Sequence, residues 1–411
     1  MSTETKRIAY LAPELPSLSA TFVTNEIWAL EEMGVEIIPF SVHTPGAKAH
    51  GERAAELAGR TRILYNQPLT SAYGALCWNA LHHKRSTLRA LGQLSGDLFK
   101  LGLITPAAIK LGYQFLRGAW LARELRRTNV EHLHIHFAHV PTQIGMYAAS
   151  LAGIPFSFMA HANDIFERPL LIKEKIRRSK RTVTISEFNV DLMHSQGGDP
   201  AQMRIVRCAV DSRQKAPWAN QDRQGEPFVI GTLGRLVEKK GVDTLIAAGQ
   251  HLRDKQLDFR IEIAGDGPLR EQLETQVQTA GLREQVIFKG SMPHSEALTW
   301  MASLNAFVLA GKKDRNGDMD GIPVVLMEAM NAGIPVLSTK LSGIPELVIH
   351  QRTGLLSDPG NAEELAANLK LLLEDPDLAR TLSMEAKKWI GTEFDRRLNA
   401  RRLLDLIHET D

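Results

Sequence analysis

The feature that most constrains the fold is a regular alternation of short apolar runs with amphipathic segments along the 411-residue chain. Runs such as Arg7–Ala12 and Phe228–Thr232 have the length and residue types of buried strands, whereas Thr21–Met33 and Gly241–His251 carry apolar residues at helical spacing. Such alternation produces parallel sheets that are covered by helices on both faces. We therefore predict an α/β protein made of doubly wound domains.

The same pattern divides the chain into two halves. A chain of 411 residues is too long for one ordinary domain. The stretch 211–227 is polar and contains Pro217, Gly225 and Pro227, which indicates a linker. We expect one domain over residues 1–210, a second over 228–390, and a C-terminal helix within 391–411 that packs back on the first. Further strands or helices are predicted at Val35–Val42, Thr70–Thr128, His132–Phe137, Pro155–Ala160, Arg181–Ile185, Phe259–Ala264, Leu269–Ala280, Val286–Lys289, Asn305–Leu309, Val324–Ala332 and Val336–Ser338.

Composition excludes several classes of protein. With 44% hydrophobic and 23% charged residues, the chain has the make-up of a soluble globular protein. The 49 basic and 47 acidic residues leave no charge excess that would favour nucleic acid. The two cysteines, Cys77 and Cys208, have no disulfide or zinc spacing. Because we also find no signal-peptide core and no run of about 20 apolar residues, we expect a cytoplasmic protein.

Two glycine turns in the second half follow predicted strands, where ligands of doubly wound domains are held. Gly231–Arg235 leads to Lys239–Gly241 at the start of a helix, and Ala264–Pro268 forms the second turn. Glycines let the backbone approach a diphosphate, and Arg235 and Lys240 could neutralise its charge. Taken singly, each turn is equally an ordinary strand-to-helix connection.

A third loop, Asp320–Glu328, places two carboxylates eight positions apart, the first before a helix and the second inside it. Residues 320–325 would present backbone amides at a helix start. Glu328 could accept hydrogen bonds from vicinal hydroxyl groups, although an acidic residue near a helix N-terminus is also favoured by the helix dipole.

Taken together, these loops resemble the donor domain of the family 4 glycosyltransferases. The shared motifs are Gly-Arg-Leu…Lys-Lys-Gly, Ala-Gly-Asp-Gly-Pro, Phe-Lys-Gly, Gly-Ile-Pro…Met-Glu-Ala-Met and Gly-Ile-Pro-Glu-Leu-Val…Thr-Gly-Leu-Leu, over residues 228–375. Asp320 to Glu328 resembles the family's Glu-x7-Glu signature, with Asp in place of the first Glu. The resemblance implies the GT-B fold, with two Rossmann-like domains facing a central cleft. It also implies metal-independent transfer of a sugar from a UDP- or GDP-sugar with retention of configuration, and no cofactor.

The family's functional residues can be placed on matching positions. The resemblance implies that Arg235 and Lys240 hold the diphosphate and stabilise the leaving nucleotide. It further implies that Glu328 binds the ribose and Asp320 faces the transferred sugar. The complete donor set is Gly234, Arg235, Lys240, Gly265, Gly267, Asp320, Gly321, Ile322, Pro323, Val324 and Glu328.

The first half resembles the family more loosely. Ser157–His161 resembles a strand that ends in a histidine contacting the donor sugar, so His161 joins Arg235, Lys240 and Asp320 as a predicted catalytic residue. Residues 13–22 resemble a Ser-Glu-Thr-Phe loop of exopolysaccharide enzymes, including those of colanic acid pathways. This implies a glycan acceptor carried on a polyprenyl diphosphate. The acceptor-side residues would be Ser19, Thr21, Asp164, Ser186 and Glu187.

Two sequence patterns resemble metal-binding sites, but we interpret neither as one. Residues 316–321 imitate the start of an EF-hand loop, yet the last ligand position would be Met327 and Pro323 interrupts the loop. A second pattern is a histidine row whose first three members point to one face of a strand: His132, His134, His136 and His139. Without a nearby cysteine or carboxylate cluster, we interpret these as satisfied or exposed side chains.

Two alternatives to a glycosyltransferase remain at this point: a GT-B sugar-nucleotide epimerase, and a non-catalytic nucleotide-sugar sensor or assembly scaffold. A membrane contact is a separate hypothesis. Nine basic residues lie between His82 and Arg127, interleaved with apolar and aromatic ones, as in helices that bind an anionic membrane surface. The same pattern also fits a domain core with a solvated outer face.

Overall fold

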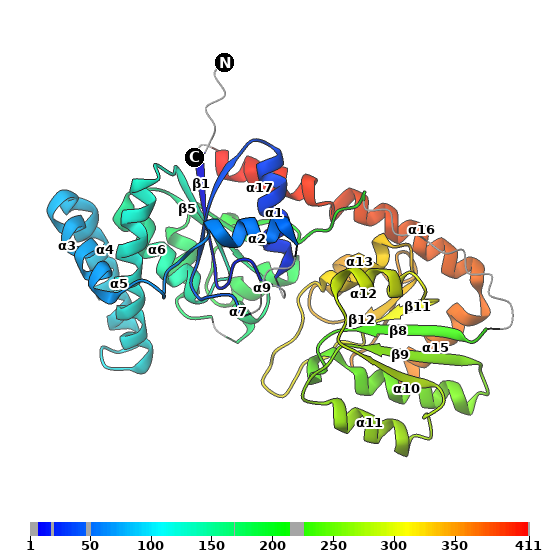
Figure 1. Cartoon of the computed structure of the whole chain (residues 1–411). Helices are drawn as coiled ribbons and strands as arrows, with labels where there is room; N and C mark the ends of the chain where they lie inside the picture. Colours follow the sequence, from blue (N-terminus) through cyan, green and yellow to red (C-terminus); the bar gives the residue numbers. More distant parts are fainter. Residues whose placement is uncertain (1–6, 18–19, 47–50, 168, 214–225, 410–411) are drawn as a thin grey trace. The chain divides into compact units, whose positions relative to one another are not determined.

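The computed structural model describes residues 7–17, 20–46, 51–167, 169–213 and 226–409 (Figure 1). The chain forms two compact units, one of residues 1–206 with 399–411 and one of residues 207–398. The first boundary precedes residue 210 because Val210 forms a β-bridge with Asp395 and donates its N–H to the Phe394 carbonyl at 3.0 Å. Most of the predicted linker, residues 214–225, lies outside the described residues.

The first unit contains a seven-stranded parallel sheet in the order β3-β2-β1-β4-β5-β6-β7. Its strands are β1 (Arg7–Ala12), β2 (Glu36–Ser41), β3 (Arg62–Ile63), β4 (His132–His136), β5 (Phe156–Ala160), β6 (Arg181–Thr184) and β7 (Met203–Ile205). The central strands are buried along nearly their whole length, as expected for a parallel sheet with helices on both faces.

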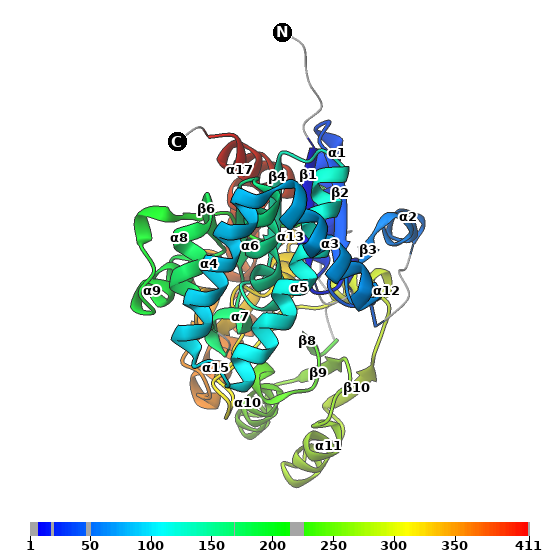
Figure 2. The same ribbon diagram turned by 90° about the vertical axis from the view of Figure 1, so that its left-hand side faces the viewer.

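The helices of the first unit are α1 (Thr21–Glu32), α2 (Glu52–Arg60), α3 (Leu69–His82), α4 (Lys84–Leu101), α5 (Pro106–Arg127), α6 (Val140–Ala152), α7 (Asn163–Phe166), α8 (Ile172–Arg178) and α9 (Glu187–Ser195). A single turn of 3₁₀ helix, η1 (Pro200–Gln202), precedes β7. Helix α6 is buried almost all round, against the sheet on one side and α4 and α5 on the other (Figure 2). Gly118 permits the close approach of α5, since a Cβ there would lie 2.9 Å from the Ile144 carbonyl oxygen.

The second unit contains a six-stranded parallel sheet in the order β10-β9-β8-β11-β12-β13. Its strands are β8 (Phe228–Leu233), β9 (Phe259–Ala264), β10 (Val286–Gly290), β11 (Ala306–Val308), β12 (Val336–Thr339) and β13 (Leu355–Ser357). Its helices are α10 (Val242–Asp254), α11 (Arg270–Thr279), α12 (His294–Met301), α13 (Val324–Asn331), α14 (Ile344–Leu347), α15 (Ala362–Glu374) and α16 (Pro376–Glu393), with the 3₁₀ turn η2 (Glu238–Lys240).

The last helix, α17 (Arg396–His408), begins in the second unit and ends in the first. Leu403, Leu404 and Ile407 are buried, and the Ile407 carbonyl accepts a hydrogen bond from Lys180 Nζ at 3.0 Å. Glu409 also forms an ion pair with Arg181 at 3.3 Å. The end of the chain therefore packs beside β6 of the first unit.

The predicted alternation of strands and helices is confirmed. Three strands were not predicted, namely β3, β7 and β13. They have only two or three residues each, too few to produce a periodic pattern.

Candidate functional site

Three loops of the second unit follow β8, β9 and β11. Because these strands are neighbours in the sheet and run in the same direction, the three loops meet at the carboxyl ends of the strands. The backbones of these loops touch at glycines. A Cβ on Gly265, whose φ is 120°, would lie 1.9 Å from the Gly234 carbonyl oxygen. At Gly267 it would lie 2.6 Å from the Leu236 carbonyl oxygen. Any larger residue would therefore push apart the two turns that were predicted to hold a diphosphate.

The basic residues of the first turn have different surroundings. The Arg235 side chain is exposed and forms no ion pair with another described residue. Lys240 lies at the end of η2 and donates to Asp320 Oδ2 at 2.5 Å. Lys239 donates to Asp318 Oδ2 at 2.7 Å and lies 3.5 Å from Asp320 Oδ1. The structure thus brings Lys240 and Asp320 together as direct partners, a contact that the sequence did not predict.

The loop therefore holds a cluster of two basic and two acidic side chains: Lys239, Lys240, Asp318 and Asp320. Each of the four is mostly shielded from water. Burial opposes the charge on Lys239, but the carboxylates of Asp320 and Asp318 outweigh it and hold the pKa of Lys239 above its ordinary value. Asp318 and Asp320 therefore face lysine ammonium groups in the loop that imitates an EF-hand.

Glu328 lies in the second turn of α13. Its Oε1 atom is 2.9 Å from Nε2 of His294, at the start of α12. This hydrogen bond raises the pKa of His294 above its ordinary value. Gly321, Ile322 and Pro323 form the turn before α13, and the helix begins at Val324 without a side-chain cap. His294 had no sequence signal, since a histidine after proline at a helix start is common.

In the first unit, Asp164 of α7 is fully buried. Its carboxylate accepts hydrogen bonds from the amides of Ala138, His161 and Ala162 at 2.7, 3.1 and 2.7 Å. Burial raises the pKa of Asp164, although these amides act in the opposite direction. Asp164 therefore fastens the loop after β4 to the loop after β5.

The other acceptor-side residues lie on helix starts. Ser186 is buried and caps α9, where its Oγ accepts from the Asn189 amide at 3.2 Å. Glu187 is exposed in the first turn of α9, and Thr21 is the first residue of α1. Ser19 lies outside the described residues. Asn189 Nδ2 also donates to the His161 carbonyl at 2.7 Å, so α9 helps to hold the histidine loop.

The histidine row lies inside the first unit. His132, His134 and His136 are buried on one face of β4, and Ser157 Oγ bridges the first two at 2.7 and 2.8 Å. One carboxylate, that of Glu26 of α1, lies 3.0 Å from His136 Nε2, a contact that the sequence did not reveal. Glu26, His134 and His136 bring three possible metal-ligand atoms within 4.8 Å of one another.

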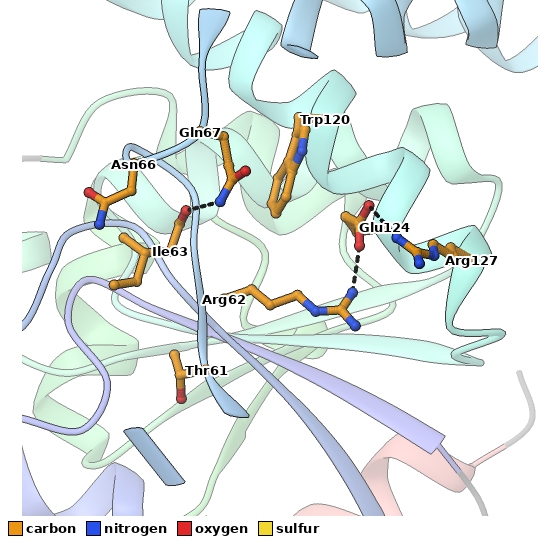
Figure 3. A pocket seen from close by; sticks show the side chains of 8 residues that line it. All are labelled: Thr61, Arg62, Ile63, Asn66, Gln67, Trp120, Glu124 and Arg127. Carbon is orange, nitrogen blue, oxygen red and sulfur yellow. Dashed lines mark hydrogen bonds and ion pairs between the residues drawn. The ribbon is translucent and has the colours of Figure 1, made fainter. Parts of the chain in front are cut away.

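A pocket of about 480 Å³ lies elsewhere in the first unit, between β3 and the second half of α5 (Figure 3). The Arg62 guanidinium points to the Glu124 carboxylate, and Trp120 lies beside them. The lining contains no residue of the predicted donor or acceptor set.

Comparison with known proteins decides the family. Residues 214–389 match the sequence profile described as "Glycosyl transferases group 1", and residues 96–214 match the profile "Glycosyltransferase Family 4". The chain is a family 4 glycosyltransferase. Because its matched relatives bear glycosyltransferase names, the enzyme is a nucleotide-sugar glycosyltransferase, and the epimerase and sensor alternatives find no support.

Two relatives of this glycosyltransferase illustrate the match. The putative colanic acid biosynthesis glycosyltransferase WcaL of Salmonella typhimurium is 27% identical over 98% of this chain and 99% of its own. The amylovoran biosynthesis glycosyltransferase AmsK of Erwinia amylovora is 30% identical over 60% of this chain and 62% of its own.

Solved structures confirm the GT-B fold of the glycosyltransferase. Anabaena HepE in complex with UDP has a TM-score of 0.71 and 17% identity, covering 98% of this chain and 99% of its own. Sucrose-phosphate synthase of Thermosynechococcus elongatus has a TM-score of 0.73 and 18% identity, with 98% of each chain covered. Among the residues that the structure describes, no helix combines the length and apolar character needed to cross a membrane.

Proposed function

We propose that this glycosyltransferase moves a sugar from a UDP- or GDP-sugar to a glycan acceptor carried on a polyprenyl diphosphate, in the synthesis of an exopolysaccharide. The acceptor class rests on the relatives named for colanic acid and amylovoran biosynthesis, and on the loop around Thr21 that resembles exopolysaccharide enzymes. The donor class rests on the two turns of the second unit that touch at Gly234 and Gly265. Arg235 and Lys240 lie next to these turns.

The contact between Gly234 and Gly265 is the observation that carries the donor assignment. It brings the two turns together beside Lys240, where a diphosphate would lie against their backbone amides. Arg235 and Lys240 would then stabilise the negative charge that grows on the departing nucleotide, so no metal ion is needed. Glu328 would hold the ribose hydroxyls, and Asp320 and His161 would contact hydroxyls of the sugar, with the anomeric configuration retained.

A donor panel tests this proposal. UDP-, GDP- and ADP-sugars are screened by thermal shift, and the stabilising donor is then incubated with a polyprenyl-diphosphate glycan. We expect transfer in the presence of EDTA, and an anomeric coupling constant in the product that shows retention. An inverted product or a strict metal requirement would contradict the mechanism, and absence of transfer from every donor would contradict the function.

We further propose that α3, α4 and α5 rest on the anionic inner surface of the plasma membrane, where such an acceptor is found. Ten of the thirteen exposed large hydrophobic side chains among the described residues lie between Leu69 and Tyr113. Phe99 is 80% exposed and Ile104 91% exposed. Part of the predicted apolar set is core instead, since Phe115, Leu116 and Trp120 are buried.

Basic side chains accompany these exposed apolar groups. Arg85 and Arg89 are exposed on α4, whereas Lys100 is engaged in an ion pair with Glu174. Replacing Arg85 and Arg89 by Glu should weaken sedimentation with anionic liposomes, because each basic residue near such a surface contributes about 1 kcal/mol. The exposed Arg283 of the second unit, changed to Glu, is the matched control. Equal binding by all three proteins, or none at low salt, would contradict membrane docking through this face.

A further inference from the structure

Glu26 is a carboxylate held deep in the first unit. It projects from α1, and its side chain is only 13% exposed. Its Oε1 atom accepts a hydrogen bond from the Tyr10 hydroxyl at 2.8 Å and lies 3.0 Å from His136 Nε2. Since an ionised carboxylate can only accept hydrogen bonds, His136 must donate its Nε2 hydrogen to Glu26.

The hydrogen position on His136 also determines the hydrogen position on His161. Its other nitrogen, Nδ1, is 3.2 Å from Nε2 of His161, and the two rings stack at 5.4 Å with only 16° between their planes. In a neutral His136 whose Nε2 carries the hydrogen, Nδ1 is an acceptor, so His161 must donate from Nε2. A neutral His161 that donates from Nε2 keeps a lone pair on Nδ1.

The His161 ring has little freedom to turn away from this partner. Phe22 and Phe137 contact it with ring centroids at 4.6 and 4.7 Å. Phe137 has a φ of 71°, in the left-handed region that a bulky residue rarely occupies. Its backbone N–H is nevertheless held by the Met159 carbonyl at 2.9 Å. The surrounding fold therefore fixes Phe137 in this strained conformation, with its ring against His161.

We infer that Glu26 and His136 are positioning residues that fix the tautomer and ring plane of His161. In this arrangement His161 donates from Nε2 to His136, and its ring is held in one plane for the proposed contact with the donor sugar. The inference rests on the proposed role of His161 in transfer. It assigns a function to Glu26 and His136, neither of which is among the donor and acceptor residues predicted from the sequence.

Two substitutions of Glu26 separate this inference from a general effect on folding. Glu26→Met removes the acceptor and should lower kcat/KM at least tenfold. Glu26→Gln keeps an oxygen that can accept from Tyr10 and His136, and should stay within about threefold of the natural enzyme. Glu31→Met is the matched control, because Glu31 lies on the same helix and pairs with Arg60. Thermal melting of each variant reports its fold.

A double-mutant cycle tests whether Glu26 acts through His161. If it does, Glu26→Met should add no further loss to His161→Ala, whereas independent contributions to stability or activity would add. Additive losses would overturn the inference. So would a Glu26→Gln enzyme as inactive as Glu26→Met, or a stoichiometric bound metal found by elemental analysis, since a metal would take the same Glu26 and His136 atoms.

A measurement on the natural protein needs no activity. Nitrogen-15 NMR distinguishes a protonated imidazole nitrogen from one with a lone pair, and the His161 signals are identified by their loss in His161→Ala. We expect hydrogen on Nε2 and a lone pair on Nδ1, and the opposite tautomer would refute the chain of hydrogen bonds. If the natural enzyme transfers no sugar while this tautomer is observed, the proposed function fails and the hydrogen-bond chain stands.

Discussion

If Lys240 holds the nucleotide as proposed, Asp320 competes with the nucleotide for it, and removal of the Asp320 carboxylate should have two opposite effects. In the structure Lys240 Nζ is 2.5 Å from Asp320 Oδ2, with the two side chains 18% and 13% exposed. A diphosphate that binds Lys240 must displace or share this carboxylate. We expect Asp320→Asn to bind UDP or GDP more tightly than the natural enzyme, yet to transfer sugar more slowly because the proposed contact with the sugar is lost.

The size of the gain in affinity follows from the contacts of Asp320. A hydrogen bond between charged groups contributes about 1.5–3 kcal/mol. Both side chains keep some contact with water, and Lys239 stays 3.5 Å from Asp320 and shares its charge, so about 1 kcal/mol should be released. This corresponds to a dissociation constant about fivefold lower.

Isothermal titration of Asp320→Asn with UDP and with GDP at low salt measures this effect directly. The gain should shrink as salt is added, because ionic screening weakens the competing pair. Asp318→Asn is the matched control, since Asp318 pairs with Lys239 and leaves the Lys240 contact intact. An unchanged or weaker affinity in Asp320→Asn would refute the competition.

Three further predictions concern other residues. Glu328→Ala should lose at least tenfold in transfer rate while its melting temperature stays close to that of the natural enzyme, because a charged hydrogen-bonding group contributes roughly 1.5–3 kcal/mol; near-normal turnover would rule out the ribose contact. Arg235→Ala and Lys240→Ala should lower kcat more than they raise KM, because the leaving-group charge develops in the transition state; steady-state kinetics showing only a raised KM would contradict this. Burial lowers the pKa of Lys175 from 10.5 to about 7, so the unfolded chain binds a proton that the folded chain releases between these values. The free energy of unfolding should therefore rise with pH above 7, and melting temperatures at pH 7 and 9 should differ more in the natural protein than in Lys175→Met.

The sequence was informative where the chemistry is local. Gly234, Gly265 and Gly267 stand directly after strands, so their place at one sheet edge followed from the alternation of elements alone. Glu328 was found because it lies eight residues after Asp320 in a known signature. The roles of these residues remain predictions, but the loops that carry them are where the pattern indicated.

The contacts that the sequence did not reveal join distant parts of the chain. Glu26 and His136 are 110 residues apart, and Lys240 and Asp320 are 80 apart. Glu26 meets the histidine row because β1 pairs with β4, which sets Tyr10 directly opposite His134. That strand order depends on how the whole sheet assembles, so no local spacing of charged residues could predict it.

The path of α17 determines how this enzyme can be divided. The second unit is one uninterrupted stretch of chain, whereas the first is completed by residues 399–411. Deleting the C-terminus would expose Lys180 and the apolar surface that Leu403 and Ile407 cover, and would weaken the unit at the opposite end of the sequence. A fragment that contains the second unit can therefore be excised from the middle of the gene, but a fragment that contains the first unit must be rebuilt by joining its two separated segments.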